Sequence, residues 1–118
     1  MIALLNDGDA RRSVAEDAVA VPHLADPEIA HAIRAQVPRG RITAADGWSA
    51  LAGWMRLGLR RFPIAGLLPR IWDLRDNLTA YDATYVALAE ALDCPLLTGD
   101  ARLATAPGPD CPITVVRR

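Results

Sequence analysis

The sequence contains no lysine, so all 13 of its basic side chains are arginine. A receiver-like signalling domain is therefore disfavoured, because it combines an acidic pocket with a lysine. Only two cysteines are present, Cys94 and Cys111, and a single possible pair is no disulfide framework. No apolar stretch approaches the roughly 20 residues that cross a bilayer, and the opening run MIALL is too short for a signal-peptide core. We expect a cytoplasmic protein without membrane segments.

Aromatic residues are also scarce, at 5% of a chain that is 52% hydrophobic. The core must therefore come mainly from Ala, Leu, Val and Ile, which suits helices packed on a small buried sheet. We expect an α/β fold and, from the length of 118 residues, a single domain over residues 1–118. No Gly-x-Gly-x-x-Gly or Walker A motif follows a predicted strand, which argues against a nucleotide-binding Rossmann domain.

Nucleophilic catalysis has no support in the sequence either. Cys94 has no paired histidine, and Ser13 and Ser49 fall in the middle of predicted helices. Glu28 and His31 fit the Glu-x-x-His motif of di-iron bundles, but that site needs a second copy and further helical glutamates. We interpret His31 as a helix-surface residue. These absences favour a metal site without a protein nucleophile.

Arginine is concentrated in the middle of the chain. Eight of the 13 lie between Arg34 and Arg75, where only Asp46 and Asp73 oppose them. Because guanidinium groups bind phosphate through two parallel hydrogen bonds, this stretch is a candidate footprint for nucleic acid. The alternative, that most of these arginines lie on solvated helix faces, remains open.

Hydrophobic periodicity predicts strands that alternate with helices, which implies a parallel sheet. We expect Asp26, Thr43, Thr79 and Asp100 to be helix N-caps, with Asp46 completing a capping box. The predicted strands are residues 19–22, 62–65, 95–98 and 113–116. The predicted helices are residues 1–5, 13–17, 27–37, 44–59, 69–75 and 80–92, with a brief helix around 103.

The predicted helix over residues 44–59 carries more aromatic surface than one side can bury. Trp48, Leu51 and Met55 form its predicted buried stripe. Trp54 is offset from this stripe, so we expect it to be exposed as an anchor for a protein interface. A wider core-facing stripe that includes Trp54 is the alternative.

Three acidic residues occupy predicted strand-to-helix junctions. Glu28 follows the strand at 19–22, Asp100 ends the strand at 95–98, and Asp82 lies in the first turn of the preceding helix. Side chains at such junctions converge beyond the carboxyl ends of a parallel sheet. Carboxylates without histidine or thiolate partners select Mg²⁺ or Mn²⁺, and such ions activate water for attack on a phosphodiester. Each residue also has a purely structural explanation, as an N-cap, a capping-box member or a favourable charge at a helix start.

Several segments resemble one known family. Residues 68–92, LPRIWDLRDNLTAYDATYVALAEAL, and residues 95–103, PLLTGDARL, resemble the C-terminal half of VapC-type PIN domains. These are the ribonuclease toxins of bacterial toxin–antitoxin pairs. Upstream, VPHLADPEIAHAIR resembles the family segment that holds its glutamate. The resemblance implies a PIN-like α/β fold, with a small parallel sheet flanked by helices, and a Mg²⁺-dependent endoribonuclease.

The resemblance also implies roles for individual residues. Glu28, Asp82 and Asp100 match three of the four acidic positions that chelate Mg²⁺ in the family, with Mn²⁺ as a substitute. Thr98 matches a hydroxyl position near the metal, and Asn77 either donates a supporting hydrogen bond or closes the preceding helix. The implied partners are an RNA substrate, a cognate VapB-like antitoxin and a second copy in a homodimer.

The sequence departs from the family at its start. Family members open with a central strand that ends in an Asp-x-Ser motif, whose aspartate is the fourth ligand, whereas this sequence begins at the following helix. Asp7 and Asp9 are poor substitutes, since about six helical residues would carry them roughly 9 Å away. Either the start is an internal methionine, or the toxin no longer holds metal properly. The alternative function is therefore a catalytically impaired PIN-fold module that binds an antitoxin or partner protein.

Overall fold

The computed structural model describes residues 19–116. The predicted helices at 1–5 and 13–17 lie outside this range, as does the start of the sequence, where the family's first strand was expected to be absent. In chain order the described elements are β1 (Ala20–Pro22), α2 (Ala25–Gln36), α3 (Ala44–Arg56), β2 (Arg60–Phe62), the 3-10 turn η1 (Ala65–Leu67), α4 (Leu68–Asp73), α5 (Ala80–Ala91), β3 (Leu96–Thr98), α6 (Ala101–Thr105) and β4 (Ile113–Val115). The predicted α/β class is therefore confirmed.

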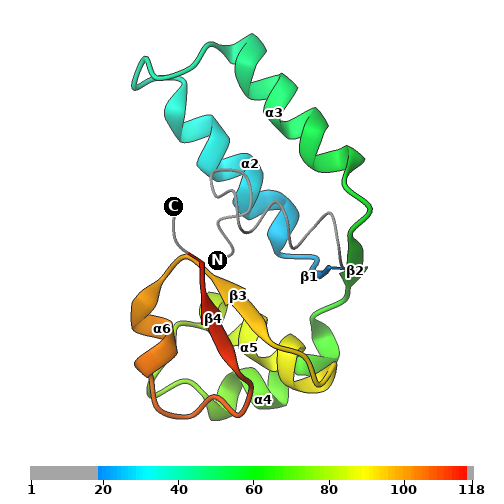
Figure 1. Cartoon of the computed structure of the whole chain (residues 1–118), viewed down its shortest axis with the longest axis vertical. Helices are drawn as coiled ribbons and strands as arrows, with labels where there is room; N and C mark the ends of the chain where they lie inside the picture. The colour runs from blue at the N-terminus through cyan, green and yellow to red at the C-terminus, as the bar shows by residue number, and fades with distance from the viewer. Residues whose placement is uncertain (1–18, 117–118) are drawn as a thin grey trace.

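The strands form two parallel pairs (Figure 1). β1 pairs with β2, and β3 pairs with β4. Helices provide the crossovers that parallel pairs require: α2 and α3 connect β1 to β2, and α6 connects β3 to β4. The parallel arrangement was predicted correctly, but the described residues form two separate pairs where a single sheet was expected.

The second strand lies earlier than predicted. It spans Arg60–Phe62, whereas the sequence pattern placed it at 62–65. Pro63 explains the shift, because a proline has no N–H for the ladder and ends a strand that would otherwise continue. The chain then turns into η1 at Ala65.

Helix α5 forms the centre of the core. Its residues 83–89 are buried without interruption, and it contacts α4, β1 and β3. A helix that is apolar on every side belongs in an interior, where it is covered from several directions. Tyr81, in the first turn of α5, is exposed. The N-terminal end of α5 therefore reaches the surface while the rest of the helix fixes its position.

Helices α2 and α3 form an antiparallel hairpin that projects away from the β3–β4 pair (Figure 1). The predicted capping box at the start of α3 is confirmed. Asp46 N–H donates to Thr43 Oγ1 over 3.0 Å, and Thr43 N–H donates to Asp46 Oδ2 over 3.3 Å. The hairpin closes tightly at Gly47, where an added Cβ would lie 3.3 Å from Ile33 Cγ2.

Asp26 is not the N-cap that the sequence predicted. Helix α2 begins at Ala25, and Leu24 is its N-cap. The Asp26 carboxylate instead accepts hydrogen bonds from Trp54 Nε1 at 2.7 Å and from Arg61 Nε at 2.8 Å. The hydrogen bond from Arg61 is the main reason that the pKa of Asp26 lies below its ordinary value.

The hydrogen bond from Trp54 to Asp26 goes with an orientation of α3 that differs from the predicted one. Trp54 is only 2% exposed, so its prediction as an exposed interface anchor is wrong. Trp48 is 62% exposed and Met55 is also exposed, although both were expected in the buried stripe. A buried indole needs an acceptor for its N–H, and Asp26 on α2 supplies one. The polar partner, together with apolar spacing, therefore decides which side of α3 faces inward.

None of the helices within residues 19–116 has the length and apolar character needed to cross a membrane. Cys94 and Cys111 are free thiols, both half-buried just before β3 and β4. Burial is the main reason that the pKa of the Cys111 thiol is raised.

Glu90 ties the C-terminal half of the fold together. Its carboxylate accepts hydrogen bonds from Arg70 Nε at 2.7 Å, from Arg70 Nη2 at 3.0 Å and from the Asp110 N–H at 2.7 Å. Arg70 also donates to the Gly108 carbonyl oxygen at 2.9 Å. The network joins α4 and α5 to the loop before β4. The hydrogen bond from Arg70 is the main reason that the pKa of Glu90 is lowered below its ordinary 4.5.

A lowered pKa in the folded state predicts acid-sensitive stability. The contribution of Glu90 is complete above the unfolded pKa, near 4.5, and is lost as the pH falls through the lower folded value. We expect Glu90→Gln to destabilise the protein by about 1–2 kcal/mol at neutral pH and to flatten its loss of stability in acid. Urea unfolding of both forms between about pH 7 and pH 3 measures this. Parallel stability curves for the two forms would contradict it.

Candidate metal centre

The three predicted carboxylates lie at the ends of their elements. Glu28 is in the first turn of α2, Asp82 is in the first turn of α5, and Asp100 lies two residues after β3 as the N-cap of α6. The predicted N-caps are confirmed here: Thr79 Oγ1 accepts from the Asp82 N–H at 3.1 Å, and Asp100 Oδ1 accepts from the Arg102 N–H at 3.0 Å. Both aspartates are therefore held by short, locally encoded turns.

A buried tyrosine fixes Glu28. The hydroxyl of Tyr85, on α5, donates to Glu28 Oε1, on α2, at 2.5 Å. The two residues are 57 positions apart in the sequence. Burial raises the pKa of Tyr85 far above its ordinary value, and the hydrogen bond to Glu28 and the charges of Glu28, Asp26 and Asp82 raise it further. Tyr85 therefore remains a neutral donor, and the negative charges of Glu28 and Asp82 act on the same buried phenol.

The role of Tyr85 was not predicted from the sequence. A signal for it was present, because a tyrosine at a buried helical position needs a partner for its hydroxyl. Its position three residues after Asp82 puts that hydroxyl near the same end of the fold.

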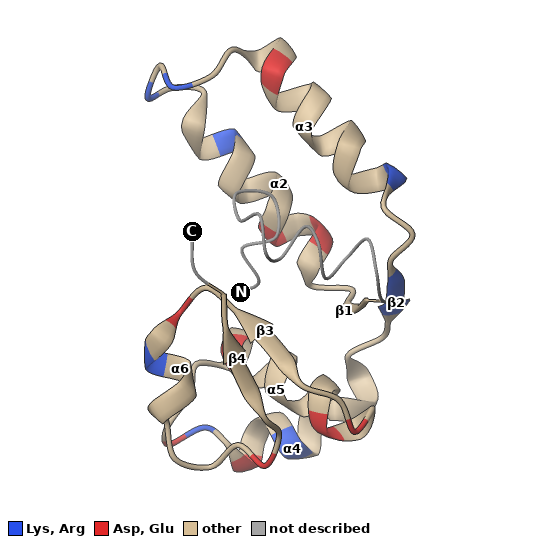
Figure 2. Cartoon of the chain, in the orientation of Figure 1, with Lys and Arg blue, Asp and Glu red and all other residues tan. Residues whose placement is uncertain are grey.

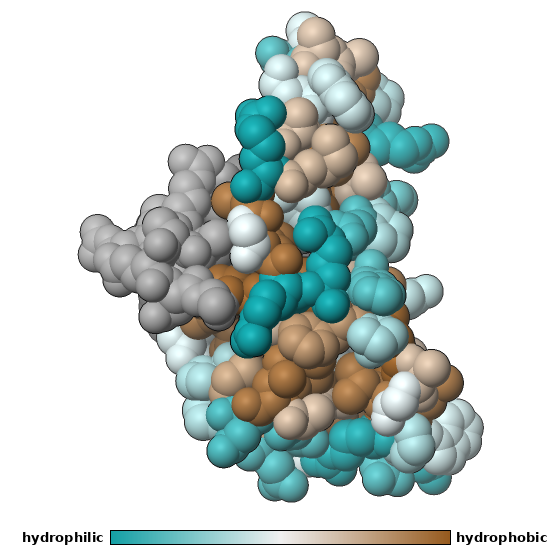
Figure 3. Space-filling model, turned by 90° about the vertical axis from the view of Figure 1, so that its right-hand side faces the viewer, coloured by the Kyte–Doolittle hydropathy of each residue, from teal (hydrophilic) through white to brown (hydrophobic). Residues whose placement is uncertain are grey.

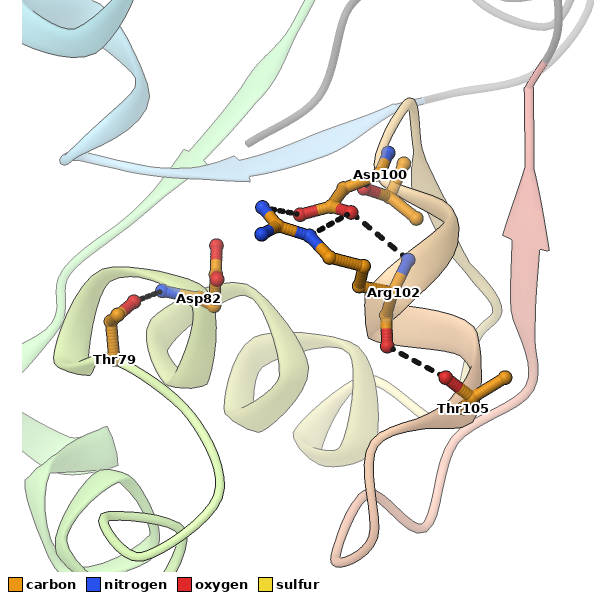
Figure 4. A network of polar contacts seen from close by, with 6 residues as sticks. Thr79, Asp82, Asp100, Arg102 and Thr105 are labelled. Atoms are coloured by element: carbon orange, nitrogen blue, oxygen red, sulfur yellow. Dashed lines mark hydrogen bonds and ion pairs between the residues drawn. The ribbon is translucent and has the colours of Figure 1, made fainter.

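Asp100 is bound by the guanidinium of Arg102 (Figure 4). Arg102 Nε donates to Oδ1 at 3.2 Å, and Nη2 donates to Oδ2 at 3.1 Å. This side-chain hydrogen bonding is the main reason that the pKa of Asp100 is lowered. The same hydrogen bonds to Asp100 are the main reason that the pKa of Arg102 is raised, and the charge of Asp82 adds to this effect. Figure 4 shows the guanidinium extending from Asp100 toward Asp82.

The two predicted supporting residues lie in different surroundings. Thr98 is fully buried, and its Oγ1 accepts from the Asp100 N–H at 3.1 Å, so it holds the turn that presents Asp100. Asn77 is exposed between α4 and α5, and its N–H donates to the Leu74 carbonyl oxygen at 3.1 Å. This bond favours the interpretation in which Asn77 closes the preceding helix.

The chemistry of these side chains fits a hard divalent cation. Glu28, Asp82 and Asp100 offer carboxylate oxygens, which Mg²⁺ and Mn²⁺ prefer. A cationic group already lies beside one of them, since the Arg102 guanidinium binds Asp100 and extends toward Asp82 (Figure 4). Within residues 19–116, however, no three Asp, Glu, His or Cys side chains lie close enough to ligate one ion as they stand. Ligation by all three carboxylates therefore requires side-chain movement.

The arginine-rich stretch divides into two groups. Arg61 and Arg70 are bound to Asp26 and Glu90, and Arg75 stacks on Trp72 with its guanidinium carbon 4.7 Å from the ring centre. The others are exposed on the α2–α3 hairpin and on β2 (Figure 2). These exposed residues are Arg34, Arg39, Arg41, Arg56 and Arg60. This second group is not held by an ion pair to a carboxylate in the described residues, so its side chains can contact a phosphate backbone.

A cavity of about 610 Å³ opens on the flank of the hairpin. Its lining residues are Asp26, Pro27, Ala30, Leu51, Trp54, Met55 and Arg61. The flank in Figure 3 carries hydrophilic side chains across its middle, with an apolar area directly below. The cavity is mainly apolar, and its charged groups Asp26 and Arg61 already neutralise each other. It therefore lacks the features of a metal site.

The sequence was compared with known proteins. No family model matches the chain. Ribonuclease VapC9 of Mycobacterium tuberculosis is 54% identical over 118 residues, which are 100% of this chain and 93% of that protein. Ribonuclease VapC1 of the same organism is 50% identical over 97 residues, covering 81% of this chain and 73% of that protein. Ribonuclease VapC12 is 38% identical over 107 residues, covering 91% and 82%.

Proposed function

Because the chain belongs to the VapC ribonuclease family, we propose that it is an endoribonuclease toxin of a toxin–antitoxin pair. It hydrolyses RNA phosphodiester bonds with Mg²⁺, or Mn²⁺ as a substitute, bound by Glu28, Asp82 and Asp100. The observation that best supports this proposal is that the carboxylates lie at the ends of their elements, with the Arg102 guanidinium bound to Asp100 and extending toward Asp82 (Figure 4). We also infer one PIN-like domain over residues 1–118, supported by the family and by the parallel βαβ connections.

Different residues of the chain would position the metal ligands and bind the RNA. Bound Mg²⁺ supplies a more acidic water and neutralises negative charge on the phosphate. Tyr85 holds the Glu28 carboxylate in one orientation, and Thr98 fixes the turn that presents Asp100. The buried helix α5 fixes the backbone of Asp82. The exposed arginines bind the RNA backbone, so RNA affinity should fall as the salt concentration rises.

The second candidate is a PIN-fold module that binds an antitoxin but cleaves no RNA. Two observations favour it. No three of the described carboxylates lie close enough together to ligate one ion, and the Asp100 carboxylate is already bound by the Arg102 guanidinium. Metal affinity separates the two functions, because a nuclease must bind a divalent ion through these carboxylates whereas a binding module need not.

Calorimetric titration with Mn²⁺ tests the proposed centre. We expect the wild-type chain to bind Mn²⁺ and Asp82→Asn to weaken this binding at least about tenfold. Asp93→Asn is the matched control: it removes the same charge from an exposed turn, where the φ of 51° is one that asparagine tolerates. Equal affinities for all three forms would favour the binding module.

Tyr85→Phe tests how Glu28 is held. The change removes only the hydroxyl, so Glu28 loses its buried donor while the packing of α5 is kept. We expect Mn²⁺ affinity to fall about tenfold and the free energy of unfolding to fall by about 1–2 kcal/mol. Calorimetry and urea unfolding measure the two effects. Wild-type metal affinity in the folded variant would show that Glu28 needs no positioning by Tyr85.

The proposed partners are RNA, a VapB-like antitoxin and a second copy of the chain. Support for a protein interface comes from α3, where the large apolar side chains of Trp48 and Met55 are exposed and do not pack in the core. The sedimentation coefficient at micromolar concentration tests the homodimer, and a monomeric value would contradict it.

A further inference from the structure

The contact between Arg102 and Asp100 differs from the two other two-pronged arginine–carboxylate pairs in the described residues. Arg61 shares Asp26 with the buried indole of Trp54, and Arg70 shares Glu90 with the Asp110 N–H while it also donates to the Gly108 carbonyl oxygen. Each of these pairs joins distant segments of the chain. Arg102 and Asp100 are two residues apart, at the start of α6, so their side-chain pair joins no distant segments of the described chain.

The Arg102 side chain of this pair is also largely exposed to solvent. The Arg102 side chain is 90% exposed and that of Asp100 is 36% exposed. Ion pairs in such contact with water contribute little to stability, because both groups remain well hydrated when they separate. The guanidinium can therefore leave Asp100 without a large loss of folding free energy.

The Arg102 guanidinium nevertheless lies on the carboxylate of a proposed metal ligand. It covers both carboxylate oxygens of Asp100, and it extends on the side of Asp82 (Figure 4). A divalent cation that binds Asp82 and Asp100 needs these same oxygens. It would also be repelled by a positive charge held a few ångströms away. The bound ion and the guanidinium therefore exclude each other at Asp100.

We propose that Arg102 is an internal counter-cation: a divalent metal displaces it from Asp100, and its freed guanidinium then binds an RNA phosphate. This inference rests on the proposed function. The always-charged fork suits both positions, since carboxylate and phosphate accept the same paired hydrogen bonds. In the metal-free protein Arg102 neutralises part of the acidic centre, and in the loaded protein it contacts the substrate.

Arg102→Gln separates these two roles by effects of opposite sign. Without the competing charge, the affinity for Mn²⁺ should rise about fivefold in calorimetry. Without the phosphate contact, the KM for a short structured RNA at saturating Mg²⁺ should rise about fivefold. Arg102→Lys keeps the charge but loses the fork, so its Mn²⁺ affinity should lie between those of wild type and Arg102→Gln.

The matched control is Arg39→Gln, which removes the same charge from the exposed turn at the far end of the α2–α3 hairpin. Its Mn²⁺ affinity should equal that of wild type. A residue with only a structural role would weaken metal and RNA binding together, so the opposed signs identify the proposed role. Circular dichroism on heating confirms that each variant is folded, as the exposure of Arg102 leads us to expect.

The outcomes distinguish this inference from the proposed function. If Asp82→Asn weakens Mn²⁺ binding but Arg102→Gln leaves it unchanged or weaker, the metal centre stands and the counter-cation role is overturned. Tighter Mn²⁺ binding with an unchanged KM would overturn the phosphate contact. If Asp82→Asn binds Mn²⁺ as wild type does, or no form binds it, the metal centre itself is overturned together with the role of Arg102.

Discussion

We expect Asp82→Asn and Asp100→Asn each to lower the rate of RNA cleavage at least about 100-fold. Both changes remove a negative charge and keep the size of the side chain. Asparagine caps a helix about as well as aspartate, so Asp100→Asn retains the start of α6. The Thr79 side chain caps α5 through the backbone N–H of residue 82, which the substitution leaves in place. A loss of cleavage therefore reports the missing charge.

The comparison requires a charge-matched control and a check of folding. Asp93→Asn should cleave RNA at the wild-type rate, because Asp93 is exposed and lies in the turn before β3. Initial rates with a labelled structured RNA in saturating Mg²⁺ measure all three variants. Retention of cleavage within about twofold of wild type by Asp82→Asn or Asp100→Asn would rule out that residue as a metal ligand.

We expect Leu74→Ala to lower the free energy of unfolding by about 3 kcal/mol. Leu74 is only 1% exposed and caps the C-terminal end of α4. Its Cδ2 would lie 3.1 Å from a Cβ added at Gly108, so it packs directly under the loop that leads to β4. Truncation to alanine opens a cavity between α4 and this loop. The melting temperature should fall by about 10 °C, given the size of the chain.

The control for this change is Leu68→Ala at the other end of the same helix. Leu68 is 56% exposed, so its truncation should change stability by less than about 0.5 kcal/mol. Urea unfolding of the three proteins gives both values. Similar losses at positions 74 and 68 would mean that Leu74 does not anchor the loop to the core. Because α4 packs against α5, the loss at position 74 should also loosen the helix that carries Asp82.

Local patterns were sufficient to predict the positions of the carboxylates. Thr79 and Asp100 cap helices through bonds to residues two or three positions away, and such bonds follow from sequence spacing. The strand that ends at Thr98 and the parallel pairing also follow from short apolar runs separated by helices. Glu28 was placed correctly in a first turn, although the helix begins earlier than expected.

Contacts between distant segments were not predictable in this way. Apolar spacing placed Trp54 outside and Trp48 inside, and the structure has the opposite arrangement. The deciding interaction joins Trp54 to Asp26, 28 residues away, and no periodicity within α3 contains it. The bond between Tyr85 and Glu28 spans 57 residues and was missed for the same reason. The candidate ligands could therefore be predicted from the sequence, whereas the residues that orient them could be identified only from the folded structure.

Cleavage of a structured RNA by the purified chain, with Mg²⁺ and then with EDTA, is the measurement that tests the central claim most directly. The metal centre at Glu28, Asp82 and Asp100 predicts discrete cuts in Mg²⁺ or Mn²⁺, none in EDTA, and none from Asp82→Asn under either condition. Cuts that persist in EDTA, or equal cutting by Asp82→Asn, would contradict a ribonuclease that depends on a metal held by these carboxylates.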